Sequence, residues 1–341
     1  MRILVTGGAG FIGSHLVERL LANGHQLTVL DDLNDFYAPA FKRQNLEAIR
    51  QIGPIDFHEA DICDQTRVLD VFQRCHPELV VHLAARAGVR PSLENPLLYE
   101  NVNVRGTMVL LEACRSMGVS RFVFASSSSI YGISNNVPFS EKDQTYLPIS
   151  PYAATKLAGE TMCYTYSHLY GLKVVCLRFF TVYGPRQRPD LAIRKFTEMI
   201  DRGESIPVFG DGTTGRDYTH IRDIVDGITA ALSLDSQFSI FNLGNAHPVD
   251  LNTVIGTIEH ALGKKAVIRR LPLQAGDVPL TYADISSAQR VLGYSPKISF
   301  SDGIKDFVEW HQIKGAIGPL LPEGPVRSEQ PILTLVRETG Y

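Results

Sequence analysis

Short, almost continuously apolar segments alternate with amphipathic segments along the first half of the chain. An apolar run at 3–5 is followed by a segment from Phe11 to Leu20 in which apolar positions recur at helical spacing, and then by a second run at 27–30. Further runs, each separated from the next by helix-length sequence, lie at 55–57, 79–83, 121–124 and 173–177. Strands that alternate with helices predict a parallel sheet covered on both faces. We therefore expect an α/β fold with a doubly wound parallel sheet.

The pattern changes at about Thr181. Glycine and proline become frequent, for example at 183–185 and 209–212, and helical segments come at less regular intervals. We expect a sheet domain over 1–180, to which some later segments return, and a smaller, loop-rich C-terminal substrate domain over 181–314. The Gly/Pro-punctuated end, 315–341, is expected to be a tail without an assigned role.

Composition narrows the class of protein. The chain has 341 residues, 44% of them hydrophobic, which is enough to bury a sizeable core without disulfide or metal staples. Its 33 Lys+Arg and 36 Asp+Glu residues give a formal net charge of −3, so there is no basic footprint for nucleic acid. The five cysteines are scattered without C-x-x-C or Cys/His ligand spacing, and we expect reduced thiols and no metal.

The chain is also expected to be cytoplasmic and independent of membranes. No apolar run approaches the roughly 18 residues that span a bilayer. The strand-like segment at 2–5 leaves no room for a signal peptide.

A glycine-rich segment lies between the first predicted strand and the first predicted helix. Gly7 permits a tight turn, Gly10 lets backbone N–H groups approach a pyrophosphate, and Gly13 lets the helix pack close to the sheet. Such a turn can also serve only to close a strand–helix corner. Here Asp31, with Asp32 beside it, ends the second predicted strand, although either carboxylate could be an ordinary loop cap. A carboxylate there can bind both ribose hydroxyls and would repel a 2′-phosphate, so the pattern favours NAD over NADP.

A tyrosine and a lysine four residues apart begin a predicted helix after Pro151. Because positions i and i+4 share a helix face, the Lys156 ammonium can lie near the Tyr152 phenol and lower its pKa toward the range of a general base. Such pairs are usually solvated helix faces. A serine run at 126–129, however, follows the strand that ends at Phe124, and ligands of open α/β sheets bind outside those strand ends.

These motifs as a set resemble those of the extended short-chain dehydrogenase/reductase family, specifically its nucleotide-sugar epimerases and dehydratases. The set also includes Leu83-Ala84-Ala85, residues 103–107 (Asn-Val-Arg-Gly-Thr) and Tyr183-Gly184-Pro185, and the match covers roughly residues 1–310 in consistent order. The resemblance implies a Rossmann domain that binds NAD and a C-terminal domain that binds a nucleotide sugar. It also implies that Tyr152 removes the proton of the sugar 4-hydroxyl while the C4 hydride passes to NAD. Lys156 would hold the nicotinamide ribose, and Ser127 would hydrogen-bond the reacting oxygen.

The cofactor contacts carried over from the family form one set. They are Gly7, Gly10, Phe11, Ile12, Gly13, Asp31, Asp32, Asp61, Ile62, Leu83, Ala84, Ala85, Asn103, Tyr152, Lys156 and Phe179. Asp61 and Ile62 match an adenine-contacting position, for which an ordinary loop carboxylate is almost as plausible a reading.

The residues after Ser127 separate the subfamilies. Dehydratases of the family carry Asp-Glu there, and UDP-glucuronate decarboxylases a Glu, whereas this chain has Ser128 and Ser129. The resemblance therefore favours C4 epimerisation through a 4-keto intermediate.

The substrate is suggested by Thr181 and Arg188, which resemble the carboxylate-binding residues of UDP-glucuronate 4-epimerases, as does the loop containing Arg90. A 4-keto hexuronate loses CO2 readily once its carboxylate is free to turn, so a clamp of arginine and hydroxyl would preserve it. The full set of substrate residues is Arg90, Ser127, Ser128, Thr181, Arg188 and Arg216. Arg216 matches a UDP-phosphate contact, whereas Gln274 replaces a second phosphate arginine of glucose-type epimerases.

The expected reaction is thus conversion of UDP-glucuronate to UDP-galacturonate. The alternatives are a UDP-glucose/galactose or UDP-N-acetylhexosamine 4-epimerase and, less favoured, a UDP-glucuronate decarboxylase or a non-catalytic NAD-sensing protein. The family commonly forms homodimers through two helices per subunit, for which 95–117 and 152–170 are candidates. Their apolar residues are equally explained by packing on their own sheet.

Overall fold

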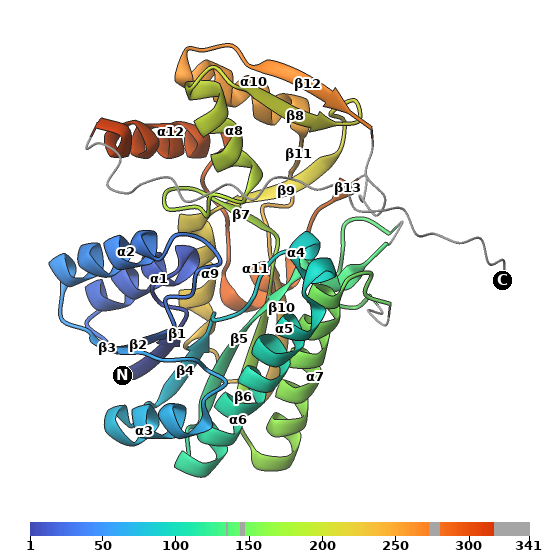
Figure 1. The fold of residues 1–341 in the computed structure, drawn as a ribbon. Coiled ribbons are helices and arrows are strands. Elements are labelled where there is room, and N and C mark those ends of the chain that lie inside the picture. The colour runs from blue at the N-terminus through green and yellow to red at the C-terminus, as the bar shows by residue number, and fades with distance from the viewer. Residues whose placement is uncertain (134–135, 144–146, 273–279, 317–341) are drawn as a thin grey trace.

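The computed structural model describes residues 1–133, 136–143, 147–272 and 280–316 (Figure 1). The larger sheet has the strand order β10-β6-β5-β4-β1-β2-β3, and every neighbouring pair in it is parallel. Its strands are β1 (Arg2–Thr6), β2 (Gln26–Asp31), β3 (Asp56–Glu59), β4 (Leu79–His82), β5 (Arg121–Ser127), β6 (Lys173–Phe179) and β10 (Phe238–Leu243). The predicted doubly wound parallel sheet is therefore confirmed.

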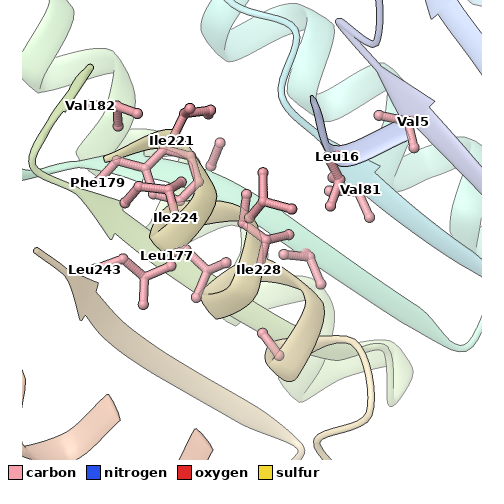
Figure 2. Close-up of a cluster of buried hydrophobic side chains, with 14 of the residues drawn as sticks. Val5, Leu16, Val81, Leu177, Phe179, Val182, Ile221, Ile224, Ile228 and Leu243 are labelled. Carbon is pink, nitrogen blue, oxygen red and sulfur yellow. The ribbon is translucent and has the colours of Figure 1, made fainter. Parts of the chain in front are cut away.

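Helices cover both faces of this sheet. One face carries α1 (Phe11–Ala22), α2 (Pro39–Ile52) and α9 (Ile221–Ala231), and the other carries α3 (Gln65–Cys75), α6 (Gly106–Met117) and α7 (Pro151–Tyr170) (Figure 1). Alternate strand residues serve the two layers, because Ile3 and Val5 belong to one buried cluster and Leu4 to the other. On the first face, Ile221, Ile224 and Ile228 of α9 pack with residues of β6 and β10 (Figure 2).

The rest of the chain builds a smaller part beyond the carboxyl ends of the large sheet. Its strands are β7 (Thr181–Tyr183), β8 (Ser205–Phe209), β9 (Gly215–His220), β11 (Pro248–Asp250), β12 (Val267–Leu271) and β13 (Leu280–Thr281), and its helices include α8 (Ala192–Asp201), α10 (Leu251–Leu262) and α12 (Phe300–Ala316). These elements share a core of their own, centred on residues such as Ile206, Val254 and Phe307. Strand β10 returns to the large sheet beside β6, and so carries the chain back across the two parts.

Short helical segments complete the fold. They are α4 (Val89–Glu94), α5 (Pro96–Glu100), η1 (Asn101–Arg105), η2 (Ser128–Tyr131) and α11 (Ser286–Leu292). No helix in the described ranges is both long and apolar enough to cross a membrane. Within the same ranges, no group of three or more His, Cys, Asp or Glu side chains could hold a metal ion.

His82 is a buried histidine at the end of β4 that must stay neutral. Thr107 donates to the Asn103 carbonyl at 2.6 Å, so its hydroxyl oxygen accepts from His82 Nε2 at 3.0 Å, and His82 Nδ1 accepts from the Thr6 hydroxyl at 2.7 Å. Burial lowers the pKa of His82 from 6.5 to about 3. Above pH 6.5 both folded and unfolded chains carry a neutral imidazole, whereas below it only the unfolded chain takes up the proton.

His82 should therefore make the protein sensitive to acid. Above pH 6.5 the neutral His82 does not lower the free energy of unfolding. At pH 5, proton uptake by His82 in the unfolded chain lowers the free energy of unfolding by about 2 kcal/mol. Urea unfolding of wild type and His82→Gln measures this effect. The difference in free energy of unfolding between the two proteins should be smaller at pH 5 than at pH 7.5. The exposed His168→Gln serves as control. Equal pH dependence of wild type and His82→Gln would contradict this role.

Candidate active site at the carboxyl ends of the strands

A cleft of about 430 Å³ lies at the carboxyl ends of β1, β2, β4, β5 and β6. This is where the crevice of an open parallel sheet is expected. The predicted site residues that line it are Gly7, Gly10, Phe11, Ile12, Gly13, Asp31, Asp32, Asp61, Ile62, Leu83, Ala84, Ala85, Ser127, Ser128, Tyr152, Lys156, Phe179, Thr181 and Arg188. The structure thus brings most of the predicted set together in one cavity.

The glycine loop forms one wall of the cleft. Gly7 has φ +71°, and a Cβ on it would lie 2.7 Å from Ala84 N. A Cβ on Gly13 would lie 2.1 Å from Gly7 O, so only glycine lets α1 begin this close to the loop. Gly10 caps α1 without a side-chain hydrogen bond, which leaves the helix N-terminus to the cleft. This cradle of close backbone and helix N-terminus fits a dinucleotide diphosphate.

Replacing Gly13 with alanine should disrupt this wall. Because the new methyl group would meet the Gly7 carbonyl, we expect the free energy of unfolding to fall by about 2 kcal/mol and the retained dinucleotide to fall roughly tenfold. Thermal unfolding and cofactor content of the purified protein measure both. Gly256→Ala in α10, where a Cβ meets nothing within 4 Å, is the matched control and should gain about 0.5–1 kcal/mol. Equal effects of the two variants would argue against the cradle.

Asp31 lies buried at the end of β2, beside the glycine loop. It accepts hydrogen bonds from Ala9 N at 3.2 Å and Leu33 N at 3.0 Å, and Lys42 Nζ lies 3.1 Å from it. Burial raises the pKa of Asp31, while the Lys42 ammonium acts in the opposite direction. Lys42 was not predicted as a site residue from the sequence. Its signal was the buried face of α2, where Lys42 shares spacing with Asn45, Leu46 and Ile49.

Tyr152 lies in the first turn of α7, whose N-terminus Ser150 caps by accepting from Ala153 N at 3.2 Å. The hydroxyl of Ser127 accepts hydrogen bonds from Ser129 N and Oγ, at 3.2 and 2.9 Å, so its own proton is free for the hydrogen bond to Tyr152. Burial raises the pKa of Tyr152, whereas the Ser127 hydrogen bond and the Arg188 guanidinium lower it. Ser127 is therefore arranged to donate to the phenolate form.

Lys156 lies one turn after Tyr152 but acts differently from the expectation. Its ammonium donates to the Ala125 carbonyl at 2.7 Å, and burial lowers its pKa to about 8. We expected Lys156 to be the cation that lowers the pKa of Tyr152. In the structure the cation that lowers the pKa of Tyr152 is Arg188. Contact of Lys156 with a nicotinamide ribose stays a prediction.

A buried polar network braces the strand end behind the serines. Arg178 on β6 pairs with Glu160 on α7 through two hydrogen bonds of 2.9 and 2.8 Å, and Ser126 donates to the same carboxylate at 2.5 Å. Arg178 also donates to the Tyr131 hydroxyl at 2.9 Å. This network joins β5, β6 and α7 directly behind the residues proposed to react, and so fixes their spacing.

Arg188 lines the cleft from the loop that follows β7. Its guanidinium makes a two-pronged contact with Asp190, at 2.9 and 2.8 Å, and lies 5.4 Å from the ring centroid of Phe36. One edge and one face of the guanidinium are thus occupied, and no hydrogen bond to Nη1 is made by the described residues, so this end can meet a ligand. Neither partner was predicted as a site residue: Asp190 lies only two residues after Arg188, whereas Phe36 is distant in the sequence and has no local signal.

The loop that carries Arg188 is fastened to helix α1. His15 Nε2 meets the Pro185 carbonyl at 2.9 Å, and Arg186 donates to Glu18 at 2.6 Å. Both α1 residues belong to the helix whose N-terminus faces the cleft. The substrate-side loop and the glycine loop are therefore held by one helix.

Three predicted residues do not line the cleft. Asn103 is buried and holds the backbone of Arg86, accepting from its N at 2.8 Å and donating to its O at 3.0 Å. Arg90 is exposed, with its guanidinium 5.3 Å from the ring of Phe209. Arg216 is half-buried and donates to the Gly215 carbonyl at 2.9 Å. Gln274 and the tail beyond residue 316 lie outside the described residues.

Comparison with known proteins identifies the family to which the chain belongs. The family model described as GDP-mannose 4,6 dehydratase matches residues 4–307. The chain belongs to this family. Membership of the extended short-chain dehydrogenase/reductases, expected from the motifs, is thereby confirmed.

Relatives and solved structures within the family include epimerases. The UDP-glucuronate 4-epimerase of Thermodesulfobacterium geofontis is 43% identical over 308 residues, which cover 90% of this chain and 95% of the relative. The crystal structure of UDP-glucuronic acid 4-epimerase from Bacillus cereus, in complex with UDP-glucuronic acid and NAD, has a TM-score of 0.87 and 36% identity, covering 92% of this chain and 100% of that one. UDP-glucose 4-epimerase of Thermotoga maritima with UDP-glucose has a TM-score of 0.85 and 35% identity, with coverage of 92% and 99%.

Proposed function

We propose that this chain, an NAD-dependent nucleotide-sugar epimerase, interconverts UDP-glucuronate and UDP-galacturonate by C4 epimerisation. The observation that carries the proposal is the position of Arg188, a mostly buried guanidinium that lines the same cleft as Tyr152 and acts on its pKa. A uronate carboxylate would pair with this cation, whereas a neutral sugar offers it no opposite charge. The relatives named as UDP-glucuronate 4-epimerases support the same substrate.

Tyr152 would serve as the base and acid of the reaction. Its phenolate accepts the proton of the sugar 4-hydroxyl and later returns it to the 4-oxygen after the ketone has presented its other face. Ser127, with its own oxygen occupied by Ser129, donates to the reacting oxygens. When bound, NAD supplies a reversible acceptor for the hydrogen on C4. The glycine loop, Asp31 and Lys156 would hold it.

Arg188 and Thr181 would hold the carboxylate. A 4-keto uronate is a β-keto acid, and it loses CO2 when its carboxylate turns so that the breaking bond aligns with the ketone. The free Nη1 end of Arg188, with the hydroxyls of Thr181 and Ser128, would restrain that rotation. Asp190 and Phe36 would keep the guanidinium oriented.

Dehydration and decarboxylation are less favoured because of where the acids lie. Among the described residues that line the cleft, the carboxylates are Asp31, Asp32 and Asp61. Asp31 ends β2, Asp32 follows it and Asp61 follows β3, whereas Ser128 and Ser129 occupy the positions beside Ser127. No lining carboxylate in the described part of the chain is therefore placed to assist a later step at C5 or C6.

The proposed function is tested by NMR of the purified protein with UDP-glucuronate and no added cofactor. Appearance of UDP-galacturonate without CO2 would support the reaction and a resident NAD together. A pentose product would mean that the keto acid is not protected. No turnover of the uronate after NAD is added, with turnover of UDP-glucose or UDP-N-acetylglucosamine, would favour the neutral-sugar epimerase instead.

A homodimer is also part of the proposal. Helices α5 and α7 contact each other and expose apolar side chains, including Leu97, Tyr164 and Leu169, which are 82%, 55% and 60% exposed. Burial of this surface in a second copy would remove it from water. Size-exclusion chromatography with light scattering should give twice the chain mass.

A further inference from the structure

Arg86 and Asn34 meet across the mouth of the glycine loop. In the sheet, β1 lies between β2 and β4. Asn34 follows β2 and Arg86 follows β4, so a contact between them spans the loop that follows β1. Arg86 Nη1 donates to Asn34 Oδ1 at 3.3 Å, and both residues line the cleft.

Each end of this bridge is fixed by its own hydrogen bonds. The Asn34 side-chain oxygen also accepts from Phe36 N at 3.2 Å, and Asn34 donates to Asp32 Oδ1 from its backbone N at 3.1 Å. The Arg86 backbone is held on both its N and its O by Asn103, whose amide also donates to Thr155 at 3.0 Å on α7. The predicted cofactor residue Asn103 therefore acts through Arg86.

The charge of Arg86 is not balanced by a described carboxylate. Of the other cations that line the cleft, Lys42 pairs with Asp31, Arg188 pairs with Asp190, and Lys156 donates to a carbonyl at the end of β5. Arg86 instead meets a neutral amide, and its Nε is buried without a hydrogen-bond partner among the described residues. A guanidinium in this state is suited to an anion, and the glycine loop beneath it is shaped for a diphosphate.

We propose that Arg86 pairs with the diphosphate of the bound dinucleotide and that its hydrogen bond to Asn34 closes a strap over the cofactor. The inference rests on the proposed function, because an epimerase returns the hydride to the same substrate and needs no exchange of cofactor between turnovers. The glycine loop holds the diphosphate from below and Arg86 from above. Release then requires the bridge to open, so the strap sets how long NAD stays bound.

The test is exchange of resident NAD for isotopically labelled NAD, followed by mass spectrometry, in full-length protein without any sugar. Arg86→Met should exchange about tenfold faster than wild type, and Arg86→Lys should fall between them because the charge remains but the fork is lost. Asn34→Ala keeps the cation and breaks the bridge, and should speed exchange several-fold. Arg115→Met is the matched control, since Arg115 is exposed and pairs with Glu112 on α6.

Salt gives a second readout. Because the contact is ionic, raising ionic strength should speed exchange in wild type more than in Arg86→Met. Exchange in Arg86→Met and Asn34→Ala within twofold of wild type would overturn the strap. If Arg86→Met does not fold, as judged by circular dichroism, Asn34→Ala decides alone. Failure of the UDP-glucuronate assay with these exchange results intact would reject the proposed substrate and not the strap.

Discussion

Replacing Tyr152 with phenylalanine is expected to lower kcat for C4 epimerisation about 10³-fold while NAD remains bound. The phenylalanine ring fills the same space in the first turn of α7 but removes the oxygen that accepts and returns the proton. The glycine loop and Lys156 are untouched, so cofactor retention should not change. The measurement is the rate of UDP-galacturonate formation by NMR, alongside NAD content per chain.

Tyr164→Phe is the matched control for that loss. Tyr164 lies on the same helix but is 55% exposed and faces away from the cleft residues, with its ring edge on Phe238. It should keep the wild-type rate. Turnover of Tyr152→Phe within tenfold of wild type would remove Tyr152 from the chemistry and leave Ser127 or a water molecule as the proton acceptor.

Replacing Arg188 with methionine is expected to lower kcat/KM for UDP-glucuronate about 100-fold and to raise the fraction of decarboxylated product. Loss of a charge-assisted contact of about 2–3 kcal/mol gives that factor, and the carboxylate of the keto acid becomes free to turn. Turnover of UDP-glucose should fall much less, because that substrate loses only the effect of Arg188 on the pKa of Tyr152. Product ratios from NMR and the two kcat/KM values separate binding from protection of the intermediate.

Two further variants make the Arg188 result interpretable. The single change leaves Asp190 without its partner, so the double variant Arg188→Met with Asp190→Asn removes both charges of the pair. Arg188→Lys retains the charge but loses the planar fork, and should retain part of the affinity while protecting the intermediate poorly. An unchanged product ratio in all three variants would contradict the carboxylate clamp.

The sequence predicted the large sheet well because its central strands are buried on both faces. Each of the apolar runs in the first half became a strand of that sheet, and alternate residues such as Ile3 and Leu4 serve opposite layers. Strand β10 was not identified, since its run at 238–243 lies in the loop-rich half of the chain and is interrupted by Ser239 and Asn242. Its pairing with β6 depends on contacts far apart in the sequence.

The candidate site was predictable where a motif encodes a backbone shape. Gly7 and Gly13 predicted a close approach of backbone segments in the glycine loop. The short distances from a Cβ placed on either residue to neighbouring backbone atoms confirm this prediction. Partners that meet through space carried no such signal: the contact of Phe36 with Arg188, and that of Arg86 with Asn34, depend on how loops from separate strands converge. Asn103 was assigned from its motif, yet its side chain serves the loop at Arg86 and not the cleft itself.

The attachment of the Arg188 loop to α1 determines what could be exchanged between related enzymes. Glu18 and His15 belong to α1, but their partners Arg186 and Pro185 belong to the loop that carries Arg188. Grafting residues 184–191 alone into a neutral-sugar epimerase would bring in Arg186 without the Glu18 carboxylate that balances its charge. The transferable unit is the loop together with positions 15 and 18. Under the proposed function, substrate preference would therefore reside in two segments that must be transferred together.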